Sequence, residues 1–176
     1  MLKWHQNGKL NRYKIRKRKY VLTGDTFLEV KFKSNKGKTA KYRRLNGVDF
    51  EKDKDFIMYK TPFCWLELTN VLNNKFERMM LVNKNNQERV SIDLNVGFSN
   101  GDDAYQYLDR LVILEIKSER HVGITELQRS LKFLHIHPSG FSKYITGMYM
   151  YHKELKFNRF KNRFRNVNKV LEKNIL

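Results

Sequence analysis

At 176 residues and 40% hydrophobic content, the chain is long enough to bury a core and predicts one domain with an appendage. Its net charge of +18 indicates an anionic partner: nucleic acid, a membrane surface or a phosphate compound. The single cysteine, Cys64, excludes an internal disulfide and a cysteine metal site, which suits a reducing compartment. No apolar run is long enough for a membrane span and the N-terminus lacks a signal-peptide stretch, so we expect a cytoplasmic protein.

The segment K-L-N-R-Y-K-I-R-K-R-K-Y carries a positive charge at every second residue. The cations of this row are Arg12, Lys14, Arg16 and Arg18. Alternate side chains of a β-strand point to opposite faces, so the four cations share one face and Tyr13 and Ile15 lie on the other. Four like charges on one face repel each other in an unliganded sheet, so the row favours a multiply charged anionic ligand.

The same alternation recurs in five later segments. These are F-L-E-V-K-F-K (27–33), T-A-K-Y-R (39–43), R-M-M-L-V (78–82), E-R-V-S-I-D-L-N-V (88–96) and R-L-V-I-L-E-I-K (110–117). Apolar and polar residues alternate in them, most weakly at 78–82, and taken together the polar side is mostly basic. About six such strands predict an antiparallel sheet that either lies open to water or curls so that the charges line a lumen.

Helix signals lie between and after these strands. An acidic interruption follows the third segment, at Asp49, Glu51, Asp53 and Asp55. Thr61 and Pro62 predict the N-cap and first residue of a helix that runs towards Asn73.

Two later helices have clearer N-terminal signals. Thr125 and Gln128 predict a capping box, and Ser142 predicts the N-cap of the next helix. The last segment has apolar residues at helical spacing among many cations: Phe157, Phe160, Phe164, Val167 and Leu171. We therefore divide the chain into a domain at residues 1–155 and a basic amphipathic helix at 156–176 that docks on it. The alternative for this helix is an anchor on a membrane surface.

Five motifs occur in one order along the chain: H-Q-N-G-K-L-N-R-Y-K-I-R-K-R, F-L-E-V-K-F-K, R-V-S-I-D, L-E-I-K and F-S-K-Y-I-T-G. Together they resemble the VTC-type polyphosphate polymerase domain, a family of the triphosphate tunnel metalloenzymes, over roughly residues 4 to 152. The resemblance implies an α+β fold, an antiparallel β-barrel with packing helices and a lumen lined by Lys and Arg.

Members of the family begin with a further strand and helical stretch, about fifty residues that have no counterpart here. We therefore expect a triphosphate tunnel fold that is incomplete at its N-terminus. Two explanations stay open: the chain is a fragment of a polymerase, or it is a member that only binds.

The resemblance also assigns roles to single residues. Arg16 and Arg18 resemble the family's paired arginines and form, with Lys143, the expected catalytic set. The other residues expected to bind phosphate or substrate are Arg12, Lys14, Lys31, Lys41, Arg78, Arg89, Lys117 and Ser142. Glu115 matches the metal-binding glutamate, with Mn²⁺ or Mg²⁺ as the divalent metal. The blander interpretation is that Glu29 and Glu115 pair with neighbouring lysines.

The implied reaction transfers the terminal phosphoryl group of ATP to a chain of inorganic polyphosphate, by positioning and charge neutralisation. The resemblance leaves a membrane-associated partner protein open and predicts no specific nucleic acid. The alternatives are a non-catalytic polyphosphate-binding protein, a hydrolase of triphosphate or polyphosphate, and a nucleic-acid-binding module. A hydrolase would need more carboxylates than Asp93 and Glu115, whereas a nucleic-acid module would need its tyrosines on the basic face.

Overall fold

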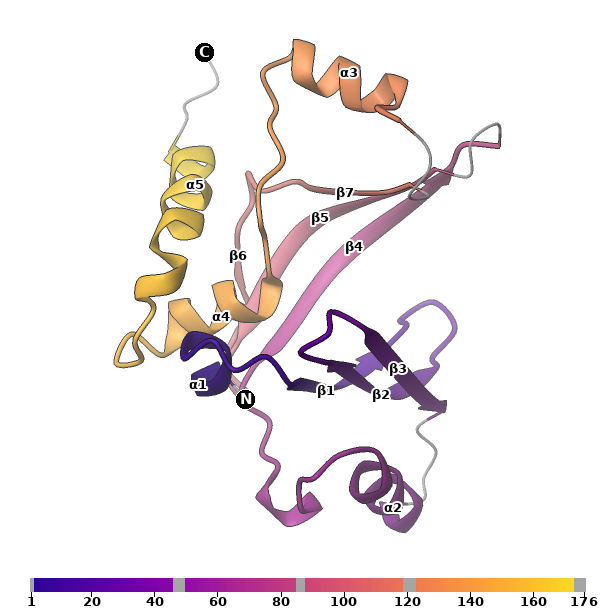
Figure 1. The fold of residues 1–176 in the computed structure, drawn as a ribbon. Coiled ribbons are helices and arrows are strands. Elements are labelled where there is room, and N and C mark those ends of the chain that lie inside the picture. Colours follow the sequence, from indigo (N-terminus) through magenta and orange to yellow (C-terminus); the bar gives the residue numbers. More distant parts are fainter. Residues whose placement is uncertain (1, 46–49, 85–87, 119–122, 173–176) are drawn as a thin grey trace. The chain divides into compact units, whose positions relative to one another are not determined.

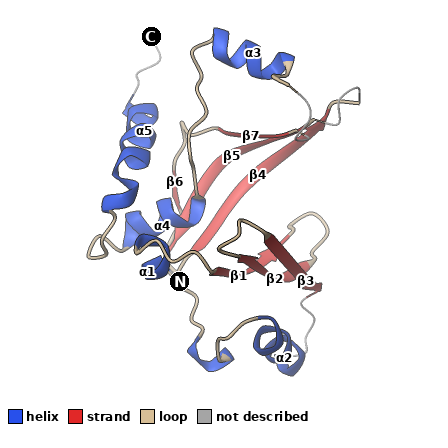
Figure 2. Ribbon diagram, viewed as in Figure 1, coloured by secondary structure: helices blue, strands red, loops and turns tan. Residues whose placement is uncertain are grey.

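The computed structural model describes residues 2–45, 50–84, 88–118 and 123–172. The chain divides into two compact units, residues 1–70 and 71–176. Each unit contains one antiparallel sheet with helices beside it in the sequence (Figures 1 and 2). The predicted α+β class, with antiparallel sheets and packing helices, is therefore confirmed.

The first unit is built on a three-stranded meander. Its elements are α1 (Leu2–Gln6), β1 (Arg12–Lys19), β2 (Thr26–Lys33), β3 (Thr39–Leu45), α2 (Phe50–Lys60) and the 3₁₀ turn η1 (Trp65–Glu67). The strands pair in the order β1-β2-β3, and each hairpin has a glycine with positive φ, Gly24 and Gly37. All three predicted strands are confirmed at the predicted positions.

The core of this unit lies on the apolar face of the meander. Leu28 and Val30 of β2 are buried together with Ile57 of α2, and Tyr13, Ile15 and other partly buried side chains surround them.

The acidic interruption in the sequence forms the helix α2, which the sequence did not predict. It begins beyond Asp49, which lies outside the described residues. Asp53 is buried and forms an ion pair with Arg44 of β3 (Nη1 to Oδ1, 3.6 Å).

The predicted helix from Thr61 to Asn73 is wrong, because Thr61 ends one helix instead of starting another. Its backbone N–H and its hydroxyl both donate to the carbonyl of Ile57, each at 2.9 Å. The hydroxyl oxygen also accepts a hydrogen bond from the N–H of Phe63, at 3.2 Å. A threonine side chain serves a turn as well as a cap, so the sequence signal was ambiguous.

The second unit is built on two long strands. Its elements are β4 (Asn73–Val82), β5 (Arg89–Ser99), β6 (Gln106–Tyr107), β7 (Ile113–Lys117), α3 (Glu126–Phe133), α4 (Lys143–Tyr151), η2 (Asn158–Phe160) and α5 (Lys161–Glu172). β5 pairs with β4 along one edge and with β6 and then β7 along the other. The three strands predicted here are confirmed, whereas the short strand β6 was missed.

The helices of this unit begin where the sequence predicts. Thr125 Oγ1 accepts a hydrogen bond from the N–H of Gln128, and Gln128 Oε1 accepts one from the N–H of Thr125, which completes the capping box. Ser142 Oγ accepts a hydrogen bond from the N–H of Ile145 at the start of α4. Phe164 of the C-terminal stripe is buried against Tyr149 of α4, and docking of the stripe on a barrel stays a prediction. The boundary at residue 155 stays a prediction.

The predicted barrel is the part of the fold that these pairings leave open. Every pairing between described strands lies within one unit or the other, so the described residues form two sheets and no closed barrel. A closed barrel with a lumen lined by Lys and Arg therefore stays a prediction.

Candidate functional site

The polar face of the first sheet carries one cation opposite another across three strands. In the strand register, Lys14 of β1 lies opposite Lys31 of β2, which lies opposite Lys41 of β3. We call these three residues the lysine row. Like charges directly opposite each other are unfavourable in an antiparallel pair, so a bound anion would stabilise this arrangement.

The neighbouring row contains the one carboxylate among the described residues of this face. Arg16, Glu29 and Arg43 lie opposite one another in the register. Arg16 donates from Nε to Glu29 Oε2 at 2.6 Å, and its Nη2 lies 2.5 Å from the same oxygen. Glu29 therefore pairs with a neighbouring cation, as the blander interpretation held, although the partner is an arginine.

The ends of this face carry the other predicted cations. Arg12 lies opposite Lys33, and Arg18 lies opposite Phe27. Arg18 Nη1 donates to the hydroxyl of Tyr20 at 3.3 Å, and Arg43 lies over the ring of Phe27, 3.7 Å from its centroid. The first unit therefore brings together all the predicted residues of its strands on one sheet face.

Tyr13 and Tyr42, the tyrosines within the first and third strands, lie on the other face of the sheet, as predicted. Tyr20, which follows β1, instead contacts Arg18 and Phe27. Tyr13 packs against Phe32, with ring centroids 4.7 Å apart, and edge-on against Phe63. Tyr42 shares that face in the register and contacts the ammonium group of Lys60. Bases bound along the cation rows would lack these rings as stacking partners, which weighs against a nucleic-acid-binding module.

The second sheet has a polar face of its own. In the register, Arg78 of β4 lies opposite Asp93 of β5, Ser91 lies opposite Glu115 of β7, and Arg89 lies opposite Lys117. Alternation places these side chains on one face. Four predicted residues of this unit therefore share a face, and they belong to a different unit from the lysine row.

A buried carboxylate organises two of the predicted cations. Asp93 is 2% exposed, and its Oδ1 and Oδ2 accept hydrogen bonds from Arg78 Nε (2.5 Å) and Nη2 (2.7 Å). Lys143, at the start of α4, also donates to Oδ2. The ring of Phe76 lies beneath both cations, 5.1 Å from the guanidinium carbon and 4.3 Å from the ammonium nitrogen. We call these four residues the Asp93 cluster.

The pKa values within the Asp93 cluster follow from burial and charge. Burial alone would raise the pKa of Asp93, but the hydrogen bonds and charges of Arg78 and Lys143 outweigh it and hold this pKa below its ordinary value. Burial lowers the pKa of Lys143, and the attraction of Asp93 and Glu115 offsets this only in part. The carboxylate is therefore ionised at neutral pH, whereas the ammonium group is easier to deprotonate than an ordinary lysine.

Glu115 is a single, accessible carboxylate on the polar face. It is half-exposed and forms an ion pair with Lys117 at 3.2 Å. No group of three metal-ligating side chains occurs among the described residues. Mg²⁺ and Mn²⁺ are often held by one or two carboxylates together with phosphate oxygens of the substrate. One glutamate on the same face as Arg89 and Lys117 fits that kind of site, and it does not fit an all-protein cage.

Ser142 and Asp93 both have structural roles. The cap at Ser142 was predicted from the sequence, whereas the contacts of Asp93 with two cations were not. The hydroxyl of Ser142 caps α4 and thereby fixes the turn that presents Lys143. Asp93 appeared in the sequence only as a carboxylate of the alternating pattern. Its partners are 15 and 50 residues away, so only the alternation, which places it on the basic face, could have pointed to it.

Comparison with known protein families gives one match, to the VTC domain, over residues 65–152. The match covers half of the chain and includes the Asp93 cluster together with Glu115 and Ser142. The lysine row lies outside it, so the roles of Lys14, Lys31 and Lys41 rest on the motifs of the sequence. No curated protein and no solved structure matches the chain. The chain therefore belongs to the VTC domain family, which relates it to polyphosphate and places it in the triphosphate tunnel superfamily.

Proposed function

We propose that this chain is a polyphosphate polymerase domain, which binds ATP and inorganic polyphosphate, transfers the terminal phosphoryl group of ATP to the end of the polyphosphate chain and releases ADP. The lysine row is the observation that carries the proposal. Three lysines lie opposite one another on adjacent strands, and the positive charge that they bring together would attract a linear polyanion lying across the strands.

Each side chain has a chemical task in this proposal. Arg16 and Arg18 would bind phosphate oxygens through their planar guanidinium groups, while Lys14, Lys31 and Lys41 would act as point charges along the polyanion. Arg12, Arg89 and Lys117 would extend the positive surface. Positioning and neutralisation would supply most of the rate acceleration, since phosphoryl transfer needs little covalent chemistry from the protein.

The Asp93 cluster would hold Arg78 and Lys143 in place for the reacting phosphoryl group. A carboxylate that binds both cations lowers the cost of keeping them close together before substrate arrives. Substrate would then meet donors whose directions are already fixed, so little ordering entropy would be lost on binding.

Glu115 would hold the divalent cation, Mn²⁺ or Mg²⁺. When bound, such a cation neutralises charge on phosphate oxygens. Glu115 would hold the cation on the face that it shares with Arg89 and Lys117. The ion pair with Lys117 would open when the cation binds.

Two other functions, a phosphate-chain hydrolase and a non-catalytic polyphosphate-binding protein, are weaker candidates. A hydrolase would need carboxylates to position water, but both oxygens of Asp93 already accept hydrogen bonds from cations. A non-catalytic polyphosphate-binding protein would use the same lysine row and differ only in turnover. The experiment below separates binding from turnover.

The setting of the domain is also part of the proposal. Residues 1–155 would form the tunnel domain and residues 156–176 its C-terminal helix, in a cytoplasmic protein that acts with a membrane-associated partner protein. Within the described ranges, no helix combines the length and the apolar character needed to cross a bilayer.

The test is an incubation of the full chain with ATP, Mn²⁺ and a short polyphosphate primer, with product length followed on a gel. We expect chain growth in the wild type and a loss of about a hundredfold in Glu115→Gln, because the cation contributes several kcal/mol. Glu77→Gln is the matched control, since Glu77 lies one residue before Arg78 and so on the opposite face of β4. Polyphosphate binding without growth would replace the polymerase by the binding protein, and shortening of the primer would indicate the hydrolase.

A further inference from the structure

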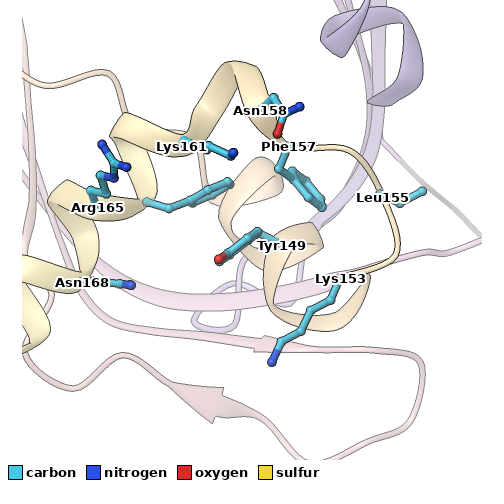
Figure 3. A pocket seen from close by; sticks show the side chains of 9 residues that line it. Tyr149, Lys153, Leu155, Phe157, Asn158, Lys161, Arg165 and Asn168 are labelled. Atoms are coloured by element: carbon cyan, nitrogen blue, oxygen red, sulfur yellow. The ribbon is translucent and has the colours of Figure 1, made fainter.

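Tyr149 lies in a second basic and aromatic cluster, which shares no residue with the Asp93 cluster. It lines a cavity of about 320 Å³ between α4, the following loop and α5 (Figure 3). Pockets for small ligands begin at about 300 Å³. The cavity is therefore of a size for one small molecule and too small for a folded partner.

One wall of the cavity is a rigid aromatic stack. Phe164 of α5 lies parallel to Tyr149, with ring centroids 3.8 Å apart and an interplanar angle of 13°. Phe157 meets both rings edge-on, at 5.3 Å from Tyr149 and 5.7 Å from Phe164. Both phenylalanines are 6% exposed, whereas Tyr149 is 38% exposed. Phe164 covers one face of the Tyr149 ring and Phe157 packs edge-on against it, while Tyr149 as a residue remains partly exposed and accessible to a ligand.

The remainder of the lining is positively charged. Lys153 follows α4, and Lys161 and Arg165 lie one turn apart on α5, with their side chains around the aromatic stack (Figure 3). All three are exposed, and the cavity lining contains no carboxylate. Asn158 adds an amide that can donate or accept. Repulsion among three cations around one cavity would be relieved by an anion of two or more charges.

We propose that this cavity binds a nucleoside diphosphate or a similar nucleoside phosphate, at a site separate from the polyphosphate-binding face. The base would stack on Tyr149, and Lys153, Lys161 and Arg165 would hold the phosphate groups. Base stacking on an aromatic side chain and charge-assisted hydrogen bonds to phosphate are both strong enough to contribute to affinity. A bare phosphate chain would use the cations only, so the aromatic wall favours a ligand with a ring. The inference does not depend on polymerase activity.

The test uses ADP as the probe, in calorimetric titrations of the full chain that carries Lys14→Gln, Lys31→Gln and Lys41→Gln. In this background the lysine row is neutral, so its own affinity for phosphate does not obscure the cavity. We expect ADP to bind at least tenfold more tightly than adenosine or pyrophosphate, because each of these lacks half of the contacts.

Substitutions then locate the site. Lys161→Gln with Arg165→Gln should weaken ADP binding at least tenfold, and so should Tyr149→Leu, whereas Tyr149→Phe keeps the ring and should stay within twofold of the parent. Lys156→Gln with Lys169→Gln is the matched control, since it removes the same charge from exposed residues outside the lining. Unchanged ADP binding in the cavity variants, or pyrophosphate binding as tight as that of ADP, would overturn the proposal. Weaker ADP binding in the cavity variants, with ADP binding unchanged in the Lys156 and Lys169 control, would support the cavity site independently of the polyphosphate-binding face.

Discussion

Lys143, the first residue of α4, donates a hydrogen bond to the buried carboxylate of Asp93, fifty residues earlier on β5. The contact ties the helix to the polar face of the sheet at the point where Arg78 also binds. Two residues that the sequence assigned to phosphate binding are therefore held by a third that it did not assign.

Replacing Asp93 by alanine should lower the free energy of unfolding by about 3 kcal/mol, because it leaves two neighbouring cations without their buried counter-charge. Chemical denaturation of the full chain measures this. Asp102→Ala is the control, since Asp102 is exposed in the loop after β5, and its effect should stay within about 0.5 kcal/mol. Equal effects of the two substitutions would mean that the Asp93 cluster contributes nothing specific.

The lowered pKa of Lys143 predicts how phosphate binding depends on pH. Burial disfavours the ammonium form, so Lys143 loses its proton below the ordinary lysine value of 10.5. The affinity for polyphosphate should therefore begin to fall on the alkaline side before most lysines titrate. Arginine stays charged in this range, so Lys143→Arg should move the start of that fall to higher pH. Lys84→Arg, at an exposed lysine, should leave the profile unchanged, and a profile unaffected by Lys143→Arg would contradict the assignment.

The lysine row should make the unliganded protein less stable than it could be. Lys31 is central, so Lys31→Gln removes two opposed pairs of like charge and should stabilise the free protein by about 0.5 kcal/mol at low salt. The same change should weaken polyphosphate binding. Lys31→Gln should therefore melt at a higher temperature than the wild type without ligand, and at a lower temperature than the wild type in an excess of polyphosphate. Lys36→Gln, in the turn between β2 and β3, controls for net charge. Destabilisation of the free protein by Lys31→Gln would show that the Lys31 side chain stabilises the fold through its packing.

Gly147 should resist substitution although it lies inside a helix, where alanine is ordinarily better by about 1 kcal/mol. A Cβ atom at this position would come within 2.6 Å of Leu72 Cδ2 and of Phe98 Cδ1, and Phe98 is fully buried. Gly147→Ala should therefore cost about 1–3 kcal/mol of stability, as overpacking does elsewhere. Gly123→Ala, at a glycine with open space around it, should be nearly neutral. A thermal melt of each variant distinguishes the two cases.

Local patterns in the sequence predicted the strands and most of the helix starts. Alternation located β1, β2 and β3 because apolar and charged residues alternate along each strand, and the Thr125 and Ser142 caps use partners within three residues. Thr61 misled because one hydroxyl can end a helix as well as begin one. The short strand β6 is two residues long, too short for any period to show.

For the candidate site, the sequence predicted only which side chains share a face of each strand. The sequence shows which residues alternate, so it identified the cations of β1 and β2 and the polar face of β5. It does not contain the register between strands, and the register is what makes Lys14, Lys31 and Lys41 a row. Contacts between distant segments, such as that of Lys143 with Asp93, depend on tertiary packing and could not be predicted from local pattern.

The central claim is that the lysine row is built for polyphosphate, and competition binding tests it most directly. A labelled polyphosphate would be displaced either by unlabelled polyphosphate or by single-stranded DNA of equal charge. We predict at least a tenfold preference for polyphosphate, and at least a tenfold loss of affinity when Lys14, Lys31 and Lys41 are all changed to Gln. The charge-matched triple variant at Lys36, Lys38 and Lys84 should keep its affinity. Equal displacement by DNA, or equal losses in the two triple variants, would contradict the account, because the surface would then be a general polyanion binder.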